Sequence, residues 1–290
     1  MEIIRSLNDM QTKSRTIIQQ QQSIGLVPTM GFFHEGHLSL MKQAKKENDV
    51  VVTSIFVNPL QFGPNEDYER YPRNEENDIM LAENVGVDII FIPDAAEMYP
   101  EKPLISMSID KRADVLCGRS RPGHFAGVLT VLTKLFHLIH PSRAYFGLKD
   151  AQQFAVVDAL ISDLNFPIQL IGLPTVREMD GLAKSSRNVN LSDSERSEAV
   201  ALYQALQAGR QLAVDGEKNP AIIVEEVMNR IEQETSGSID YVELLSYPAL
   251  KPVSKVDQRV ILAVALQFTK ARLIDNLIWD KDSRPVNFIK

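Results

Sequence analysis

The sequence predicts an α/β protein in which a doubly wound, Rossmann-like parallel sheet is followed by a smaller α+β domain. Helical and extended patterns alternate through about the first 175 residues, as they do in βαβ units. Several of the extended runs are apolar on both faces, which is typical of parallel strands covered by helices on each side. After about residue 175 the order changes to helices followed by extended runs. We therefore expect one domain at residues 1–175 and a second, acting as a lid, at residues 176–290.

Each element of the first domain follows from its hydrophobic period. An opening helix is expected at residues 6–22, and strands are expected at 24–27, 50–57, 88–92, 144–146 and 168–173. Further helices are expected at 38–46, 74–85, 127–139 and 150–164. The clearest of them is 127–139, because Val128, Val131, Leu132 and Leu135 recur at helical spacing.

The second domain is expected to hold helices at 193–214 and 220–235, then strands at 239–245, 260–267 and 271–278. In doubly wound sheets, ligands bind beyond the carboxyl ends of the parallel strands. The turns at 28–37, 58–63 and 147–153 hold the unusual residues of this chain. These turns are therefore expected to carry the chemistry.

The first of these turns contains His34, Gly36 and His37 between an apolar run and a helical stretch. Unpaired N–H groups and the helix dipole favour anions at a helix N-terminus, and a glycine there lets the backbone approach closely. Two histidines three residues apart project from one helix face and can donate to neighbouring phosphate oxygens. The pattern suggests a triphosphate site, with surface histidines near a helix cap as the alternative.

Composition limits the classes of function. The chain has 290 residues, of which 44% are hydrophobic, so it can bury a full core. Its net charge of −7 argues against nucleic acid as a partner. No signal-peptide pattern and no run of membrane-spanning length is present, so a cytoplasmic protein without a membrane partner is expected. Its single cysteine, Cys117, excludes an internal disulfide and is expected to be a packing residue.

Charge is unevenly distributed, since no Asp or Glu occurs between Asp114 and Asp150. A local positive field in an acidic protein suits a polyphosphate site. The candidates that flank the central helix of this window are Arg119, Arg121, His124 and Lys149. His137 and His140 are instead interpreted as helix-end or core histidines, because the stretch around them keeps helical spacing.

A basic loop, Lys184-Ser185-Ser186-Arg187, lies near the expected domain junction. Two cations and two hydroxyl groups on a flexible connection can close over phosphates from the opposite side of a site. Taken alone, the segment is better explained as an ordinary basic loop.

Together these segments resemble the pantothenate synthetase family, within the HIGH-motif nucleotidylyltransferase superfamily, over essentially the whole chain. The matching motifs are 27–31 with 34–37, 56–62, 71–73, 121–125, 145–153, 181–188 and 271–276. Two departures are Phe32-Phe33, where many members carry smaller or aliphatic residues, and Lys184, at a position that is often apolar. Neither affects the histidines.

The resemblance implies an ATP-dependent condensation of (R)-pantoate with β-alanine to pantothenate, AMP and pyrophosphate. The implied route passes through a pantoyl adenylate and uses Mg²⁺, and the family implies a homodimer. A carboxylate nucleophile is already ionised near neutral pH, so positioning and charge stabilisation should dominate catalysis.

The resemblance also assigns residues. The implied ATP-binding residues are Met30, Gly31, Phe32, Phe33, His34, Glu35, Gly36, His37, Gly147, Leu148, Lys149, Asp150, Val176, Lys184, Ser185, Ser186 and Arg187. Of these, His34, His37 and Lys149 are expected to be catalytic. Gln61 and Gln153 fall at pantoate-binding positions, and Gln61 also adjoins the β-alanine site. Asp150 is expected to bind the ribose or, through water, magnesium, with helix capping as an equally good explanation. No direct metal ligand from the protein is assigned.

Two other functions are considered. One is a nucleotidylyltransferase that stops after transferring AMP or CMP to a phosphate-bearing substrate. The length of the second domain and the glutamine pair count against it. The other is a non-catalytic nucleotide-binding regulator, which has no need of both histidines together with Lys149 and Lys184. Formation of AMP in the presence of pantoate and β-alanine would distinguish all three.

Overall fold

The computed structural model describes residues 1–64, 66–286 and 288–289. Its larger sheet has six strands: β1 (Glu2–Ile4), β2 (Ile24–Thr29), β3 (Val50–Ile55), β4 (Ile89–Phe91), β5 (Arg143–Gly147) and β6 (Gln169–Leu173). They lie in the order β1-β4-β3-β2-β5-β6, and every neighbouring pair is parallel. The chain winds from β2 through β3 to β4, then returns to the other side of β2 for β5 and β6. The predicted doubly wound sheet is therefore confirmed.

The edge strand β1 was not predicted. It has three residues, of which only Ile4 is buried. A segment this short shows no readable hydrophobic period, and it becomes a strand because it pairs with β4 in the folded sheet.

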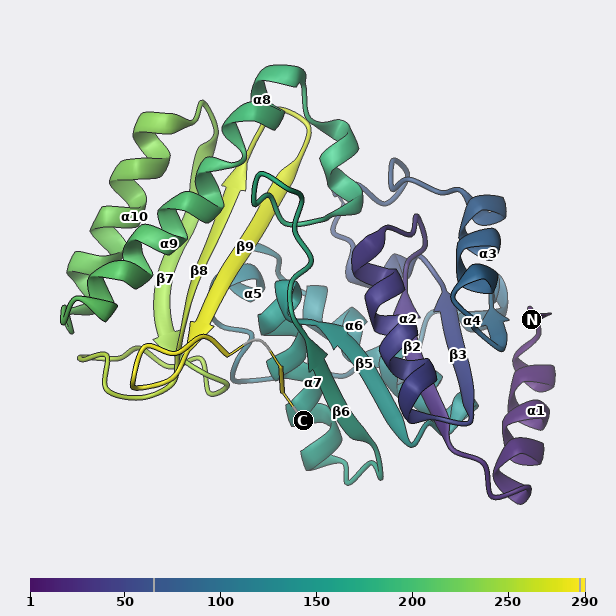
Figure 1. Cartoon of the computed structure of the whole chain (residues 1–290). Coiled ribbons are helices and arrows are strands. Elements are labelled where there is room, and N and C mark those ends of the chain that lie inside the picture. Colours follow the sequence, from purple (N-terminus) through teal and green to yellow (C-terminus); the bar gives the residue numbers. More distant parts are fainter. Residues whose placement is uncertain (65, 287, 290) are drawn as a thin grey trace.

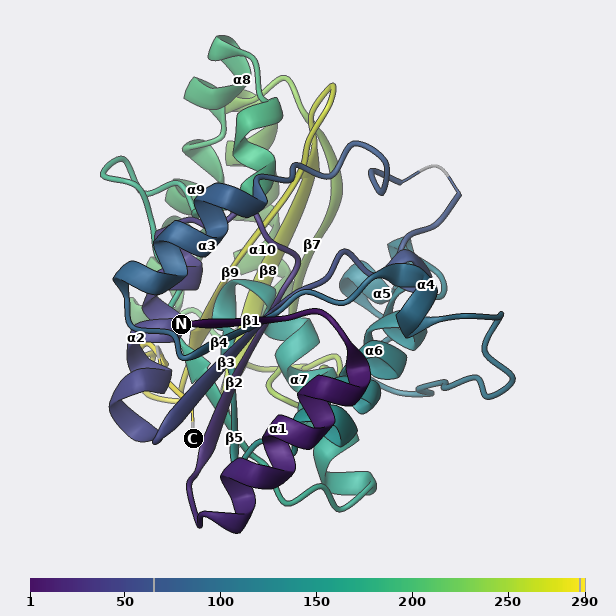
Figure 2. The same ribbon diagram turned by 90° about the vertical axis from the view of Figure 1, so that its right-hand side faces the viewer.

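Helices cover both faces of this sheet, as Figure 2 shows. One face carries α1 (Leu7–Gln19), α6 (His124–Ile139) and α7 (Ala151–Asp163), and the other carries α2 (Glu35–Glu47) and α3 (Glu75–Asn84). Two short helices, α4 (Ala95–Met98) and α5 (Leu116–Ser120), lie in the connection between β4 and α6. The helix α2 begins three residues earlier than its apolar period indicates, so that His37 belongs to its first turn.

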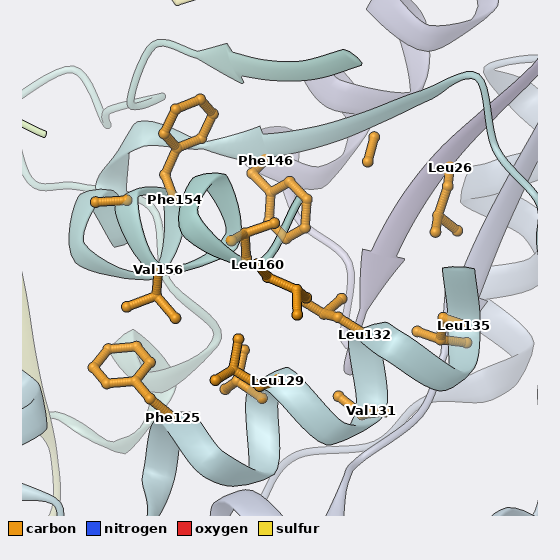
Figure 3. Packing of buried hydrophobic residues seen from close by; sticks show 14 of the residues in the cluster. Leu26, Phe125, Leu129, Val131, Leu132, Leu135, Phe146, Phe154, Val156 and Leu160 are labelled. Atoms are coloured by element: carbon orange, nitrogen blue, oxygen red, sulfur yellow. The ribbon is translucent and has the colours of Figure 1, made fainter. Parts of the chain in front are cut away.

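Adjacent strand residues supply two separate cores. Leu26 packs in the cluster that contains α6 and α7, whereas Val27 packs in the cluster with α2 and α3. Figure 3 shows the first of these, in which Leu129 and Leu132 of α6 face Phe146 of β5 and the side chains of α7. Because both faces are buried, the strands read as continuous apolar runs.

The second sheet is antiparallel, with strands β7 (Ser238–Ser246), β8 (Val260–Gln267) and β9 (Arg272–Trp279) in that order. Helices α9 (Ala201–Val214) and α10 (Pro220–Glu234) pack beside it (Figure 1). The alternate residues of β8 divide between two clusters: Leu262 packs with α9 and α10, and Ile261 packs in the cluster of α6 and α7. The second sheet therefore packs directly against the helices α6 and α7 of the first sheet.

The single helix expected at residues 193–214 is wrong. The structure has two helices, α8 (Asp193–Glu198) and α9, separated by Ala199 and Val200. Both of these residues keep right-handed helical dihedral angles, so the break leaves the hydrophobic period almost unchanged and cannot be read from it. In the part of the chain that the structure describes, no helix is long and apolar enough to cross a membrane.

Candidate active site

A cavity of about 220 Å³ lies beyond the carboxyl ends of β2, β3, β5 and β6, where a doubly wound sheet binds its ligand. We call it the histidine cavity. Of the residues predicted to form a site, those that line it are Met30, His34, Gly36, His37, Gln61, Gly147, Lys149, Asp150, Gln153, Val176, Lys184, Ser185, Ser186 and Arg187. Residues from four distant segments of the sequence therefore meet in one place.

The two histidines form a reciprocal cap at the start of α2. His34 is the N-cap residue, and its Nδ1 accepts the backbone N–H of Gly36 at 3.1 Å. Nδ1 of His37 accepts the backbone N–H of His34 at 3.3 Å. A neutral imidazole that accepts at Nδ1 carries its proton on Nε2. Both rings are therefore fixed as Nε2–H donors, and their centroids lie 4.1 Å apart.

Both histidines are neutral at physiological pH. Burial and then the Lys149 ammonium lower the pKa of His34 to about 4. Burial holds the pKa of His37 well below its ordinary value; repulsion between the two imidazoles, were both protonated, and the Lys149 ammonium act in the same direction. Neutral donors bind phosphate oxygens without the cost of keeping two imidazolium ions side by side in a cavity.

The turn after β5 brings the Lys149 ammonium to the cavity. Lys149 lies in a 3₁₀ turn (Leu148–Asp150) and its side chain is 18% exposed. Nδ2 of Asn276, on β9, donates to the carbonyl oxygens of Leu148 at 3.0 Å and of Lys149 at 2.9 Å. The second sheet thus fixes the backbone that carries Lys149, a role that the sequence did not reveal for Asn276.

Asp150 occupies the N-cap position of α7, but its side chain makes no capping hydrogen bond. Its side chain is 51% exposed, and Oδ1 lies 3.9 Å from Nζ of Lys149. Helix capping therefore does not explain this residue. Its carboxylate is available to the cavity that it lines.

The basic loop crosses the histidine cavity from the other side. Nζ of Lys184 lies 3.2 Å from Oε2 of Glu35, and the Ser186 hydroxyl donates to the carbonyl oxygen of Phe32 at 3.3 Å. Arg187 holds Asp67 through two hydrogen bonds of 2.8 and 3.1 Å. The contacts of Lys184 and Ser186 tie the loop to the start of α2 and to the turn that precedes it, and Arg187 ties it to Asp67. The basic loop is therefore attached to other segments of the protein, and its role toward phosphates stays a prediction.

The two predicted glutamines both line the cavity, but their surroundings differ. Gln61 is buried: its Oε1 accepts from Nδ2 of Asn58 at 3.1 Å, and its Nε2 lies 3.3 Å from Sδ of Met30. Gln153 is half-buried. Its neighbour Gln152 turns away and donates to the carbonyl oxygens of Arg112 and Val115, which makes it a structural residue.

Of the residues between Asp114 and Asp150, a segment without Asp or Glu, some line the cavity and others do not. Arg121 and His124 line the cavity and both donate to the carbonyl oxygen of Gln61, at 3.3 and 2.8 Å. Arg121 is also paired with Glu66. Arg119 instead pairs with Glu243 at 2.6 Å, outside the histidine cavity.

His137 and His140 are exposed at the end of α6, as their interpretation as helix-end residues predicted.

Cys117 is buried, with Sγ 3.2 Å from the hydroxyl of Tyr241. It faces a second cavity of about 470 Å³ between the two sheets. This second cavity shares Arg121, Lys149 and Gln153 with the first, so the cleft continues toward β7, β8 and β9.

Five predicted residues do not line the histidine cavity: Gly31, Phe32, Phe33, Glu35 and Leu148. Gly31, Phe33 and Leu148 are buried in the protein. These positions shape the turns that carry the donors.

A parallel doubly wound sheet with a pair of imidazoles at a helix N-terminus beyond its strand ends is the arrangement of a nucleotide-binding α/β protein. A family model described as pantoate-beta-alanine ligase matches residues 2–278. The chain belongs to this family, and it is therefore a ligase and not a regulator or a nucleotidylyltransferase that stops at AMP transfer.

Relatives and solved structures agree over nearly the full length. A pantothenate synthetase of Bacillus subtilis (strain 168) is 58% identical over 280 residues, which cover 96% of this chain and 98% of that protein. The crystal structure of pantothenate synthetase from Thermus thermophilus matches with a TM-score of 0.91 at 42% identity, covering 98% of this chain and 100% of that one. The crystal structure of a pantoate-beta-alanine ligase from Francisella tularensis, complexed with beta-gamma ATP and beta-alanine, matches with a TM-score of 0.80 at 36% identity, covering 97% of this chain and 98% of that one.

Proposed function

We propose that this chain condenses (R)-pantoate with β-alanine at the expense of ATP, forming pantothenate, AMP and pyrophosphate. The observation that carries the proposal is the convergence of the histidine pair, Lys149, the basic loop and the two glutamines on one cavity. Family membership supports the same reaction, as does the Francisella relative with its nucleotide and β-alanine.

The first step is attack of the pantoate carboxylate on the α-phosphorus of ATP. A bond forms between a carboxylate oxygen and this phosphorus, and the bond to the β-phosphate bridging oxygen breaks, which releases pyrophosphate. The nucleophile is already an anion, so no general base is needed. We assign the Nε2–H groups of His34 and His37 and the Lys149 ammonium to the charge that develops on the departing phosphates.

The remaining ATP contacts are assigned by segment. Residues 30–37 and 147–150 border the triphosphate, and Val176 offers backbone contacts to adenine. The backbone N–H of Lys184 already donates to the carbonyl oxygen of Val176 at 2.9 Å. The base-binding segment and the loop at residues 184–187 are therefore directly linked.

Magnesium fits this site as a companion of the nucleotide. In the described part of the chain, no group of three or more His, Cys, Asp or Glu side chains is placed to hold a metal ion. Mg²⁺ commonly binds through substrate phosphates and one or two carboxylates, and Asp150 is the exposed carboxylate beside Lys149. Bound there, the ion would neutralise phosphate charge.

The second step joins the amine of β-alanine to the acyl carbon of the adenylate, with AMP as the leaving group. The mixed anhydride lasts only if water is excluded. We assign this exclusion to the loop at residues 184–187 and to the second domain, residues 176–290, as the lid. A homodimeric state and a cytoplasmic location stay predictions of the resemblance.

The two-step route gives a direct test. With ATP and pantoate but without β-alanine, we expect labelled pyrophosphate to exchange into ATP, because adenylate formation is reversible and needs no amine. Exchange is measured by recovery of label in ATP, with pantoate omitted as the control. A strict requirement for β-alanine would contradict a separate adenylation step.

We also assign the pantoate hydroxyl and carboxylate groups to Gln61 and Gln153, and the β-alanine contact to Gln61. Met30 and Phe62 line the same cavity and offer an apolar wall for the geminal methyl groups. Amides suit the polar end because each supplies both donors and acceptors.

Gln61→Ala and Gln153→Ala should each raise the KM for pantoate by roughly 10- to 150-fold, because a hydrogen bond to a charged partner contributes about 1.5 to 3 kcal/mol. Steady-state kinetics with varied pantoate measures the effect, and calorimetric titration with ATP is the internal control. Gln169→Ala is the matched variant, since the Gln169 side chain is exposed and its Oε1 accepts from Nε of Arg143 at 3.1 Å. Equal losses of ATP and pantoate affinity would show that the pantoate pocket is misplaced.

A further inference from the structure

A buried carboxylate outside the histidine cavity accepts hydrogen bonds from the turn that leads into the two histidines. Asp78 lies on α3 and is 1% exposed. Its Oδ2 accepts the backbone N–H of Phe32 at 2.7 Å, and its Oδ1 accepts that of Phe33 at 2.6 Å. One side chain thus satisfies two consecutive backbone donors more than forty residues away in the sequence.

The turn that Asp78 holds is conformationally demanding. Gly31 has φ = +82° and Phe32 has φ = +53°, so two successive residues adopt the left-handed region. A non-glycine residue in this region is uncommon and persists where surrounding contacts hold it. A Cβ at Gly31 would approach Oδ2 of Asp78 and Cγ2 of Ile55 to 3.0 Å each, so a larger residue here would crowd the carboxylate.

This turn determines where the two imidazoles lie. The backbone passes from Phe33 directly into His34, whose side chain caps α2 and whose own N–H is held by His37. The ring of Phe33 is 5.5 Å from the ring of His37. On the other side of the same turn, the carbonyl oxygen of Phe32 accepts from Ser186 in the basic loop. Asp78 therefore holds the point where the histidine cap and the loop meet.

We propose that Asp78 is a positioning residue for ATP activation, which holds the turn at residues 31–33 so that His34 and His37 present their donors to the triphosphate. Asp78 does not line either the histidine cavity or the larger cavity next to it, so it acts through the turn and not on the substrate. The proposal rests on the assignment of the two histidines to the phosphates.

The test separates the two chemical steps in one protein sample. In sequential mixing, enzyme with ATP and pantoate first accumulates adenylate, and β-alanine is added afterwards. Asp78→Asn keeps the size of the side chain but turns an amide NH₂ toward a backbone N–H. We expect adenylate formation to slow by up to about 100-fold, the scale that a small misplacement of a catalytic group produces. The later formation of the amide should stay within about twofold of the unaltered protein, because the triphosphate is gone by then.

A matched control for Asp78→Asn is available in the second domain. Glu195 also uses both carboxylate oxygens to accept backbone N–H groups, those of Thr269 and Ser192, each at 2.9 Å. Glu195→Gln should lower the free energy of unfolding in a similar way while leaving the ratio of the two step rates unchanged.

The chain has only five histidines, so their imidazole NMR signals give a second readout. The signals of His34 and His37 should shift in Asp78→Asn and not in Glu195→Gln.

Three results would decide the matter. Slowing of the first step alone, with shifted histidine signals, supports the proposal. Equal slowing of both steps, or of neither, overturns it and leaves Asp78 a structural residue. If Asp78→Asn does not fold, the same ratio is measured on Asp78→Ser, which lacks the misplaced donor. The histidine assignment itself is tested independently by replacing His37: if that replacement leaves adenylation intact, the proposed function fails at this point whatever Asp78 does.

Discussion

Replacing His37 by alanine is expected to lower the rate of adenylate formation by about 100- to 1,000-fold, the effect of removing one preorganised donor from a developing charge. His37 lines the cavity, accepts the N–H of His34 at Nδ1, and is thereby fixed as an Nε2–H donor. The residue is half-buried at the first turn of α2, outside the hydrophobic clusters. Folding should survive, with a loss of about 1 kcal/mol from the missing cap.

Rapid-quench measurement of adenylate formation checks this expectation, with circular dichroism as the test of folding. His137→Ala is the matched control, because His137 is exposed on α6 and its ring contact is with Phe166. Adenylation at the normal rate in a folded His37→Ala protein would remove this histidine from the mechanism.

The second large effect is expected for Lys149→Met, which keeps an unbranched side chain but removes the ammonium group. The loss of one charge-assisted donor to phosphate should slow adenylation by about 100-fold or more. The same change should raise the pKa of both His34 and His37, because the Lys149 ammonium is one of the causes that lower them. NMR titration of the two imidazoles measures this directly.

Lys45→Met is the control for Lys149. Lys45 is a partly exposed lysine of the same domain that pairs with Asp88 at 2.7 Å, and exposed pairs of this kind contribute little to stability. Its replacement should change neither the adenylation rate nor the histidine pKa values. If Lys149→Met behaves like Lys45→Met, the phosphate contact assigned to Lys149 is contradicted.

The elements of the first sheet could be predicted because their signals are local. Strands β2, β3 and β6 are apolar on both faces, and α6 repeats its apolar residues at helical spacing. The chemistry of the turn at His34 was also local, since a cap, a glycine and a second histidine lie within four residues. The strand β1 and the break between α8 and α9 carry no such signal and were missed.

The choice between neighbouring side chains could not be made from the sequence. Gln152 and Gln153 are adjacent glutamines, yet helix phase turns the first toward the carbonyl oxygens of Arg112 and Val115 and the second toward the cavity. Arg119 and Arg121 divide in the same way, one to Glu243 and the other to Glu66. Only the packing of α5 and α7 against distant segments decides which residue faces the cavity.

By itself, the sequence determined the doubly wound sheet, the turn with two histidines at a helix N-terminus and the residues that resemble one enzyme family, because hydrophobic period and capping chemistry act over a few residues. The tertiary structure decided what holds those residues in place. Asp78 reaches the turn at Phe32 and Phe33 from α3, and Asn276 reaches the backbone of Lys149 from β9. A hydrogen bond between residues 46 or 127 positions apart leaves no local pattern, since only the folded sheet order brings its donor and acceptor within reach.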